Sequence, residues 1–234
     1  MPTTYLQHIK HNMSIFDSIL TVITPYECLG CGAEGRLLCG TCAQQLTTLP
    51  GRCYRCLRPS LSGLTCPDCS AISSLHRVQA ATAYAGVAKE LVWRLKSAGA
   101  KTAPRHMADL LVSRLSVTPR TVIIPVPTAT SRVRSRGYDQ AKLLAHELSR
   151  KTRLPYRDCL VRSGKTRQVG TSRRQRLNQL HDAFRVKNAR NLTAMDVLLV
   201  DDVMTTGATL EIAATTLRSA GAGRVEAAVF CIAE

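Results

Sequence analysis

Short apolar runs alternate with segments of helical character from about residue 79 to the end of the chain. The runs rich in strand-forming residues cover positions 79–84, 121–126, 157–162, 196–201 and 225–231. The helical stretches between them cover roughly 86–98, 104–116, 139–151 and 208–220. Runs that are apolar at every position, such as VLLV within 196–201, are typical of strands covered on both faces. The alternation therefore predicts an α/β domain with a parallel sheet over residues 79–234.

The last helical stretch has the clearest periodicity. Leu210, Ala213, Ala214 and Leu217 recur at i, i+3, i+4 and i+7, and Gly221 follows as a stop signal. This helix is expected to begin just after the strand at 196–201. Ligands of such sheets bind beyond the carboxyl ends of the strands, so this junction is a candidate site.

The N-terminal part of the chain is organised by cysteines instead. Eight of the ten cysteines fall within 42 residues as four CxxC pairs: Cys28/Cys31, Cys39/Cys42, Cys53/Cys56 and Cys66/Cys69. Two residues between ligands let both sulfurs of a pair reach one ion from a tight turn, which suits tetrahedral zinc. A segment of this length cannot build an adequate apolar core, and bound metal must therefore stabilise it. We predict two structural Zn²⁺ ions in a module at 28–70, after a helical segment at 1–27.

Two ways of combining these four CxxC pairs into two metal sites remain open. Sequential pairing closes the shortest loops and makes a double zinc ribbon, whereas a cross-brace would join the first pair to the third and the second to the fourth. Disulfide or redox chemistry and an iron–sulfur cluster are the less favoured alternatives, because a redox CxxC is expected once, beside a βαβ pattern. The module carries little net positive charge, so we expect it to dock a partner or brace the larger domain.

Positive charge is concentrated in one part of the chain. The whole sequence has 32 Lys+Arg against 16 Asp+Glu, and residues 120–190 hold 18 of the bases but only four acids. This concentration indicates a bound polyanion, either a polyphosphate or a nucleic acid. No apolar run approaches the ~20 residues that a membrane span needs. We therefore expect that the protein does not span a membrane and that it is located in the cytoplasm.

Two acidic residues stand at the end of the strand at 196–201, and a Thr/Gly loop follows them. The strand ends in Asp201 and Asp202. The loop that leads into the next helix contains Thr205, Thr206, Gly207, Ala208 and Thr209. Backbone N–H groups and the helix dipole favour a phosphate there. Ionised carboxylates only accept hydrogen bonds, which suits the vicinal hydroxyls of a ribose. The junction therefore predicts a site for a ribose 5-phosphate.

This segment resembles the phosphoribosyl pyrophosphate (PRPP) motif of type I phosphoribosyltransferases. The cysteine pairs, the Pro-Val-Pro at 125–127 and the Arg-Gly-Tyr-Asp-Gln at 136–140 narrow the resemblance to the ComF family, which is linked to DNA uptake in natural competence. Asp139 stands where that family has Asn. The resemblance implies a type I phosphoribosyltransferase fold behind a small zinc-ribbon module. It also implies that Asp201 and Asp202 take the ribose hydroxyls, that 205–209 wraps the 5-phosphate, and that Mg²⁺ accompanies the pyrophosphate.

Arginines are the candidates for the charge of the leaving pyrophosphate. Arg132, Arg134 and Arg136 follow the strand at 121–126, and Arg173, Arg174 and Arg176 lie in a polar stretch that resembles the superfamily's closing loop. We assign catalytic roles to Arg136, Arg176 and Asp201. Arg132 is assigned to PRPP binding together with the acidic pair and loop 205–209.

Nothing in the sequence identifies the acceptor of a phosphoribosyl group. The leading hypothesis is PRPP·Mg²⁺ binding, with phosphoribosyl transfer as the reaction class and a role in competence. A PRPP sensor is one alternative. Another is a non-enzymatic factor that handles single-stranded DNA through residues 120–190, with a DNA-uptake protein docked on the zinc module. With three Phe and one Trp, the chain offers few platforms for stacking bases.

Overall fold

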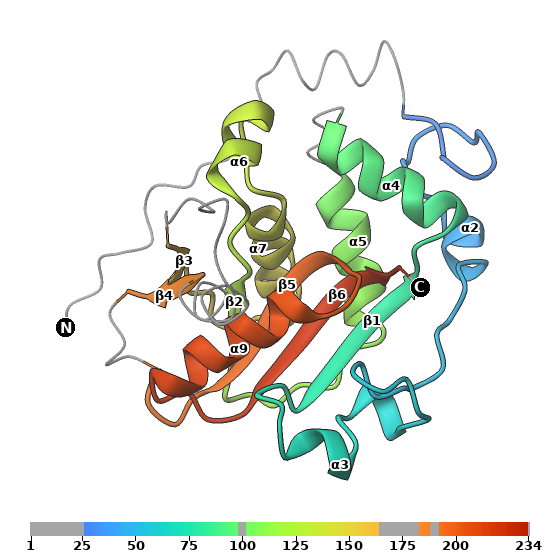
Figure 1. Cartoon of the computed structure of the whole chain (residues 1–234). Coiled ribbons are helices and arrows are strands. Elements are labelled where there is room, and N and C mark those ends of the chain that lie inside the picture. Colours follow the sequence, from blue (N-terminus) through green and yellow to red (C-terminus); the bar gives the residue numbers. More distant parts are fainter. Residues whose placement is uncertain (1–25, 98–101, 164–182, 188–191, 234) are drawn as a thin grey trace, which may run out of the picture. The chain divides into compact units, whose positions relative to one another are not determined.

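The computed structural model describes residues 26–97, 102–163, 183–187 and 192–233 (Figure 1). It divides into two units, Met1–Gln44 and Gln45–Glu234. The described part of the first unit holds the cysteines from Cys28 to Cys42 and a short helix, α2 (Gly40–Gln44). The second unit holds the remaining cysteine pairs and every strand found among the described residues.

A four-stranded parallel sheet forms the centre of the second unit. Its order is β1-β6-β5-β2, with β1 at Arg77–Ala83, β2 at Thr121–Pro125, β5 at Asp196–Met204 and β6 at Val225–Ile232. Every residue of β2 is buried, as are all but the last residue of β6. The α/β class and the parallel sheet expected from the apolar runs are therefore confirmed.

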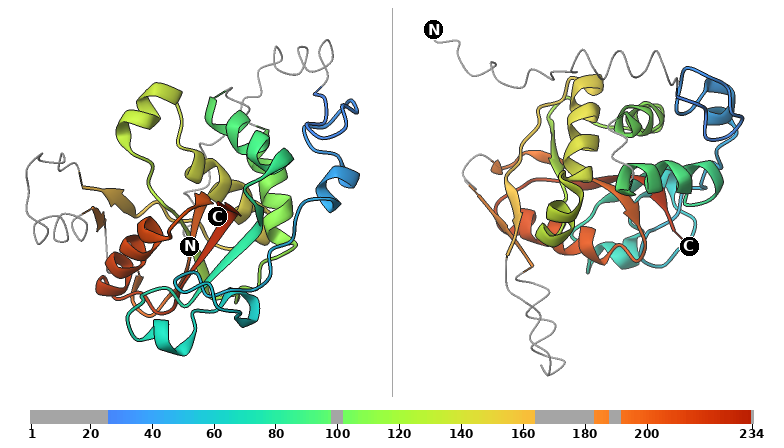
Figure 2. Two further views of the ribbon diagram at one scale, coloured as in Figure 1. Left: turned by 45° about the vertical axis from the view of Figure 1, so that its right-hand side comes forward. Right: turned by 90° about the horizontal axis from the view of Figure 1, so that it is seen from above.

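Helices cover both faces of this sheet. Helix α9 (Ala208–Ser219) lies on one face, while α5 (Ala103–Val112) and α7 (Gln140–Thr152) lie on the other, with α4 (Gly86–Ser97) beside α5 (Figures 1 and 2). The four periodic positions of α9 are all buried, as their spacing predicts. A further short helix, α6 (Thr130–Arg136), was not expected from the sequence. It follows β2 directly and carries the first arginine group.

The run at 157–162 does not join the parallel sheet. Its last three residues form β3 (Leu160–Arg162), which pairs antiparallel with β4 (Phe184–Val186) in a separate two-stranded sheet. The residues just before it make one isolated bridge to β2, where Ile123 N–H donates to Pro155 O and Arg157 N–H donates to Ile123 O. The expectation of a fifth parallel strand is wrong because pairing with β2 stops after this bridge, and the next residues pair with β4 instead.

The division between the units falls between the two halves of the cysteine region. The sequence places all eight cysteines in one module at 28–70, whereas the structure assigns the second four to the unit that contains the sheet. There they lie with a 3-10 turn, η1 (Leu61–Gly63), and helix α3 (Pro67–Ser70). The proposed helical segment at 1–27 falls almost entirely outside the described residues. Among those that are described, no helix is long and apolar enough to cross a membrane.

Candidate functional site

The eight cysteines of the CxxC pairs gather in two sequential sets. Cys28, Cys31, Cys39 and Cys42 form one set, and Cys53, Cys56, Cys66 and Cys69 form the other, with all sulfur atoms of a set within 4.8 Å of one another. The Sγ atoms of Cys31 and Cys39 lie 3.7 Å apart, and those of Cys56 and Cys66 lie 3.6 Å apart. A tetrahedral zinc with bonds of about 2.3 Å separates its sulfur ligands by about 3.8 Å. Each set could therefore hold one metal ion, and the sequential pairing is the one that the structure shows.

Hydrogen bonds to the sulfurs favour thiolates in both sets. Burial raises the pKa of Cys28, but backbone N–H groups, led by that of Cys39 at 3.3 Å, bring it down to about 6. The side-chain hydrogen bond from Arg58 lowers the pKa of Cys56 to about 6 as well. In contrast, the neighbouring thiol of Cys39 raises the pKa of Cys42 to about 12. Thiolates packed this closely repel one another, so not all four thiols of a set lose their protons easily. A divalent cation removes this repulsion.

The second cysteine set is attached to helix α9 through Tyr54, the residue after Cys53. The Tyr54 hydroxyl contacts the Glu211 carboxylate and lies 2.6 Å from Ser73 Oγ. The same carboxylate accepts hydrogen bonds from Ser73 Oγ at 3.0 Å and from Ser74 N–H at 2.7 Å. Burial, reinforced by Glu211, raises the pKa of Tyr54 to about 12. No sequence pattern signals this contact, because its partners are 157 positions apart.

The acidic pair lies near the carboxyl end of strand β5, which the sequence ends at 201 and the structure continues to Met204. Asp202 is buried and its carboxylate pairs with Lys96 Nζ at 2.7 Å. Asp201 Oδ1 accepts the N–H of Asp202 at 2.8 Å, and Asp202 Oδ1 accepts the N–H of Val203 at 2.9 Å. Burial and, after it, the charge of Asp202 raise the pKa of Asp201 well above its usual range. The two carboxyls are thus held side by side, one of them neutralised by a lysine.

The loop after this pair exposes polar groups at the start of α9. Thr205, Thr206, Ala208 and Thr209 are exposed, whereas Gly207 is buried and caps the helix with a φ of 74°. Only glycine adopts this left-handed conformation at little cost. Hydroxyls and backbone N–H groups therefore converge at the positive end of a 12-residue helix, an arrangement that suits an anion. Ligand contact by these residues stays a prediction.

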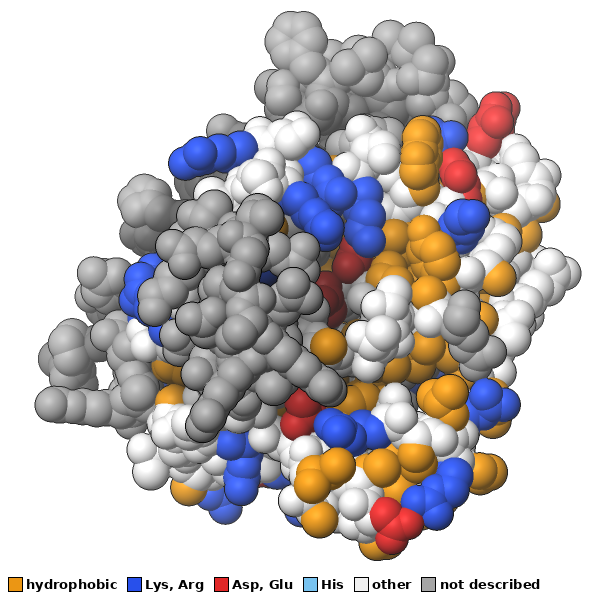
Figure 3. All heavy atoms as spheres, viewed as in Figure 1, with side chains coloured by type: hydrophobic (Ala, Val, Ile, Leu, Met, Phe, Trp, Pro, Cys, Tyr) orange, Lys and Arg blue, Asp and Glu red, His pale blue; other side chains and the backbone are white. Residues whose placement is uncertain are grey.

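One described arginine, Arg162, interacts through its charge with both Asp201 and Arg132. Burial lowers the pKa of Arg162, the charge of Arg132 lowers it further, and Asp201 opposes the change, so Arg162 is near both residues. Arg162 Nε also donates to Pro127 O at 3.1 Å, and Pro127 lies two residues after the end of β2. Sequence reasoning missed Arg162, although its place at the end of a strand is a usable signal. On the face seen in Figure 3, basic side chains gather beside recessed acidic ones.

The other predicted arginines are divided between described and undescribed parts of the chain. Arg134 is exposed on α6, and Arg136, its last residue, is partly buried. Arg173, Arg174 and Arg176 lie outside the described residues. Their assignment to a closing loop stays a prediction.

Asp139 has a structural role at the start of α7. Its carboxylate accepts the N–H of Lys142 at 3.2 Å, which makes it the N-cap of the helix. It also accepts from Thr128 N at 3.3 Å and Thr128 Oγ1 at 3.0 Å. Asp and Asn cap helices about equally well, which accounts for Asp in place of Asn. The capping bonds tie the loop after β2 to α7.

The parallel sheet, the acidic pair and the Thr/Gly loop together define a phosphoribosyltransferase domain. In agreement, residues 133–233 match the family model described as "Phosphoribosyl transferase domain". The chain is 30% identical over 195 residues to "Competence protein ComFC" of Bacillus subtilis, covering 79% of each chain. It is 29% identical over 211 residues to "Competence protein F" of Haemophilus influenzae, with 85% of this chain and 87% of that one covered. The chain therefore belongs to the ComF family.

Two further proteins are similar to this chain. "DNA utilization protein YhgH" of Shigella flexneri is 30% identical over 209 residues, with 83% of this chain and 89% of that one covered. Among solved structures, glutamine PRPP amidotransferase from B. subtilis, complexed with ADP and GMP, aligns with a TM-score of 0.42 and 19% identity. That alignment covers 55% of this chain and 26% of the amidotransferase, so the chain spans about a quarter of its length.

Proposed function

We propose that this chain binds PRPP or another ribose 5-phosphate, with Mg²⁺ on the pyrophosphate, at the carboxyl end of β5. The observation that carries the proposal is the juxtaposition of Asp201 and Asp202 with loop 205–209 at the start of α9. The loop offers hydroxyl and N–H donors to the 5-phosphate. The acidic pair offers acceptors to the two ribose hydroxyls.

The ion pair between Lys96 and Asp202 supports this assignment. Lys96 Nζ lies 2.7 Å from Asp202 Oδ2, so a positive charge faces the buried carboxylate whose oxygens would accept a ribose hydroxyl. Asp201 has a raised pKa because it is buried beside a second acid. Two hydroxyl donors would stabilise its ionised form, so ligand binding is expected to lower that pKa.

Phosphoribosyl transfer is the reaction that such a site supports. An acceptor lone pair forms a bond to the anomeric carbon, the bond from that carbon to the pyrophosphate oxygen breaks, and pyrophosphate leaves with the electron pair. Mg²⁺ supplies charge neutralisation on the pyrophosphate when it is bound. Arg162 interacts through its charge with both Asp201 and Arg132, and we propose that Arg132 and Arg162, with Arg136 and Arg176, stabilise the charge that develops there.

Calorimetric titration tests the proposed ligand directly. PRPP with Mg²⁺ should bind more tightly than ribose 5-phosphate, because the pyrophosphate adds contacts with the arginines. Ribose 5-phosphate should in turn bind where ribose alone does not, because the loop holds the phosphate. Failure of both phosphates to bind would overturn the proposal.

We also propose that the two cysteine sets hold Zn²⁺ and that the protein acts in competence-linked DNA handling. The names of the relatives from B. subtilis, H. influenzae and S. flexneri refer to competence or to DNA utilization. The excess of 18 bases over four acids in 120–190 favours single-stranded DNA as a second ligand. The cysteine module is the proposed docking surface for a DNA-uptake protein.

A further inference from the structure

The only tryptophan of the chain lies on the exposed side of helix α4. Trp93 is 52% exposed, the largest exposed fraction of any Phe, Tyr or Trp among the described residues. The exposed positions of α4 recur at helical spacing, and they are Gly86, Lys89, Trp93 and Ser97. The buried positions of the helix form a separate set. The tryptophan ring therefore lies outside the set of side chains that pack α4 against its neighbours.

Positive charge surrounds this ring. The guanidinium carbon of Arg94 lies 5.8 Å from the centroid of the Trp93 ring. Lys89 is exposed one turn before Trp93, and Lys96 lies one turn after it. Glu90 is the single acid of α4, and its carboxylate pairs with Arg94 Nε at 3.1 Å. An exposed aromatic ring among cations offers one surface to a base and others to phosphates.

The last turn of α4 also adjoins the basic segment and the acidic pair. The hydroxyl of Tyr138, which follows α6 and its arginines by two residues, donates to Leu95 O. Lys96, three positions after Trp93, pairs with Asp202. Side chains three positions apart on a helix lie about 5–6 Å from each other. A nucleic-acid strand that contacts the arginines of α6 can therefore continue onto the exposed side of α4.

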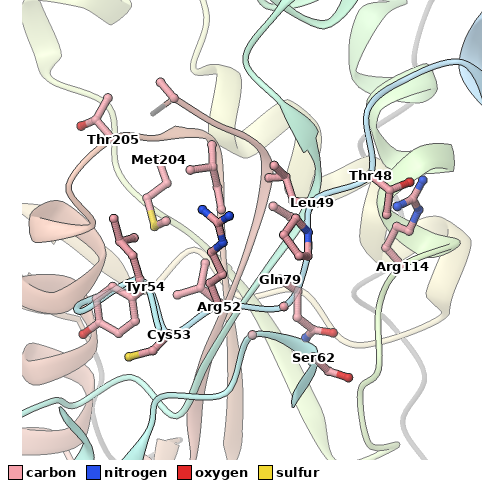
Figure 4. Close-up of a pocket in the computed structure, with 18 of the residues that line it drawn as sticks. Thr48, Leu49, Arg52, Cys53, Tyr54, Ser62, Gln79, Arg114, Met204 and Thr205 are labelled. Atoms are coloured by element: carbon pink, nitrogen blue, oxygen red, sulfur yellow. The ribbon is translucent and has the colours of Figure 1, made fainter. Parts of the chain in front are cut away.

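This surface is distinct from the cavity of about 800 Å³ beside loop 205–209 (Figure 4). The cavity is lined by the segment before the second cysteine set, by β1 and by Met204, Thr205 and Thr206. Among the described residues that line it, none belongs to α4. A ligand on Trp93 would therefore not occupy this cavity.

We infer that Trp93 is a stacking platform for a base of single-stranded DNA, with Lys89 and Arg94 beside the flanking phosphates. The inference rests on the proposed role in DNA handling. Stacking on a side chain needs an unpaired base, so a duplex does not fit this surface. A protein-docking surface has a core of several apolar side chains, whereas the other exposed residues of α4 are Gly, Lys and Ser.

Tryptophan fluorescence tests the inference, because all tryptophan emission of the full chain comes from Trp93. Oligo(dT) of about 16 nucleotides is titrated beside an abasic strand and a duplex of the same length. Oligo(dT) should quench the emission, whereas the abasic strand, which has no base to stack, should not. Trp93→Ala should weaken oligo(dT) binding about five- to 100-fold, as expected for the loss of one stacked base, when measured by anisotropy of labelled DNA. Trp93→Phe should retain most of the affinity.

Three controls separate stacking from charge and from misfolding. Tyr26→Ala should bind DNA as the parent does, since Tyr26 is 38% exposed but belongs to the first unit. Lys89→Ala should reduce the slope of log K against log[salt] by about 0.7, whereas Trp93→Ala should leave the slope unchanged, because a stacked ring releases no counterions. Trp93→Ala should also bind ribose 5-phosphate as the parent does.

The outcomes distinguish this inference from the proposed functions. If the parent chain binds no single-stranded DNA, the DNA-handling proposal fails and the inference fails with it. If the parent binds oligo(dT) and Trp93→Ala binds it equally tightly, the inference alone is wrong. Equal quenching by the duplex or by the abasic strand would also overturn it. The ribose phosphate proposal is judged separately, by titration of the parent with ribose 5-phosphate.

Discussion

The ring of Tyr54 lies directly against Gly207. A Cβ atom added to Gly207 would come within 2.8 Å of Tyr54 Cδ2, and Gly207 has a φ of +74°. The glycine that caps α9 therefore has no free space on the side of the second cysteine set. This contact, with the Tyr54–Glu211 hydrogen bond, makes the cysteine-bearing segment a support for the proposed phosphate loop.

Gly207→Ala should destabilise the protein through both strain and collision. The left-handed conformation costs an alanine about 1–2 kcal/mol, and the clash with Tyr54 adds to it. Gly86→Ala is the matched control, because Gly86 has a φ of +47° but nothing within 4 Å of an added Cβ. Melting temperatures should show the larger loss for Gly207→Ala, and Tyr54→Ala in the same chain should recover part of it. Equal losses in the two alanine variants would mean that Tyr54 does not constrain the glycine.

Metal analysis should find close to two zinc ions per chain. The expectation follows from two sets of four sulfurs, each with the spacing of a tetrahedral site. The protein should be purified without chelator and its zinc measured by elemental analysis. A count of zero or one would contradict the assignment of both sets.

Loss of the second metal site should weaken ribose phosphate binding, whereas loss of the first should not. Cys53 precedes Tyr54, so Cys53→Ser should release the ring that lies against Gly207. Cys28→Ser is the matched control, since Cys28 belongs to the first unit. Titration with ribose 5-phosphate gives the comparison. Unchanged affinity in Cys53→Ser, with one zinc lost, would show that the second set does not support the loop.

Asp201→Asn should raise the stability of the ligand-free protein at neutral pH. Because folding raises the pKa of Asp201, the unfolded chain releases this proton more readily, and the folded state is disfavoured above the usual carboxyl pKa of about 4. Asn removes that cost and can still accept the N–H of Asp202. The melting temperature of the variant should exceed that of the parent at pH 7, and the gap should narrow as the pH falls toward 4. A lower melting temperature at pH 7 would refute this electrostatic account.

Binding of single-stranded DNA, if it uses the basic segment, should depend steeply on salt. Log K should fall with log[salt] by about 0.7 for each phosphate neutralised. Arg173→Ala with Arg174→Ala should flatten the slope, as measured by fluorescence anisotropy across a salt series. An unchanged slope in the double variant would place the DNA on another surface.

The sequence predicts those features whose signals are local. The alternation of apolar runs predicts the parallel sheet, the period in 208–220 predicts α9, and the cysteine spacing predicts two four-sulfur sets, although it leaves their pairing open. Short motifs also identify the family. What it misses depends on contacts between distant positions. Tyr54 meets Glu211 across 157 positions, and β3 pairs with β4 over only three residues each.

The most direct test of the central claim is the PRPP affinity of the double variant Asp201→Asn with Asp202→Asn. Each lost charge-assisted hydrogen bond is worth roughly 1.5–3 kcal/mol, so two should cost about two to four decades of affinity. Asp109→Asn with Asp158→Asn is the matched control, since those acids pair with Lys151 and Lys142 on the surface. Melting curves must show that both variants fold, because Asp202→Asn leaves Lys96 without its carboxylate. By isothermal titration with PRPP and Mg²⁺, we expect weak or undetectable binding in the first variant and parental binding in the control. Parental affinity in the folded Asp201/Asp202 variant would contradict the ribose phosphate site and leave DNA handling as the better account.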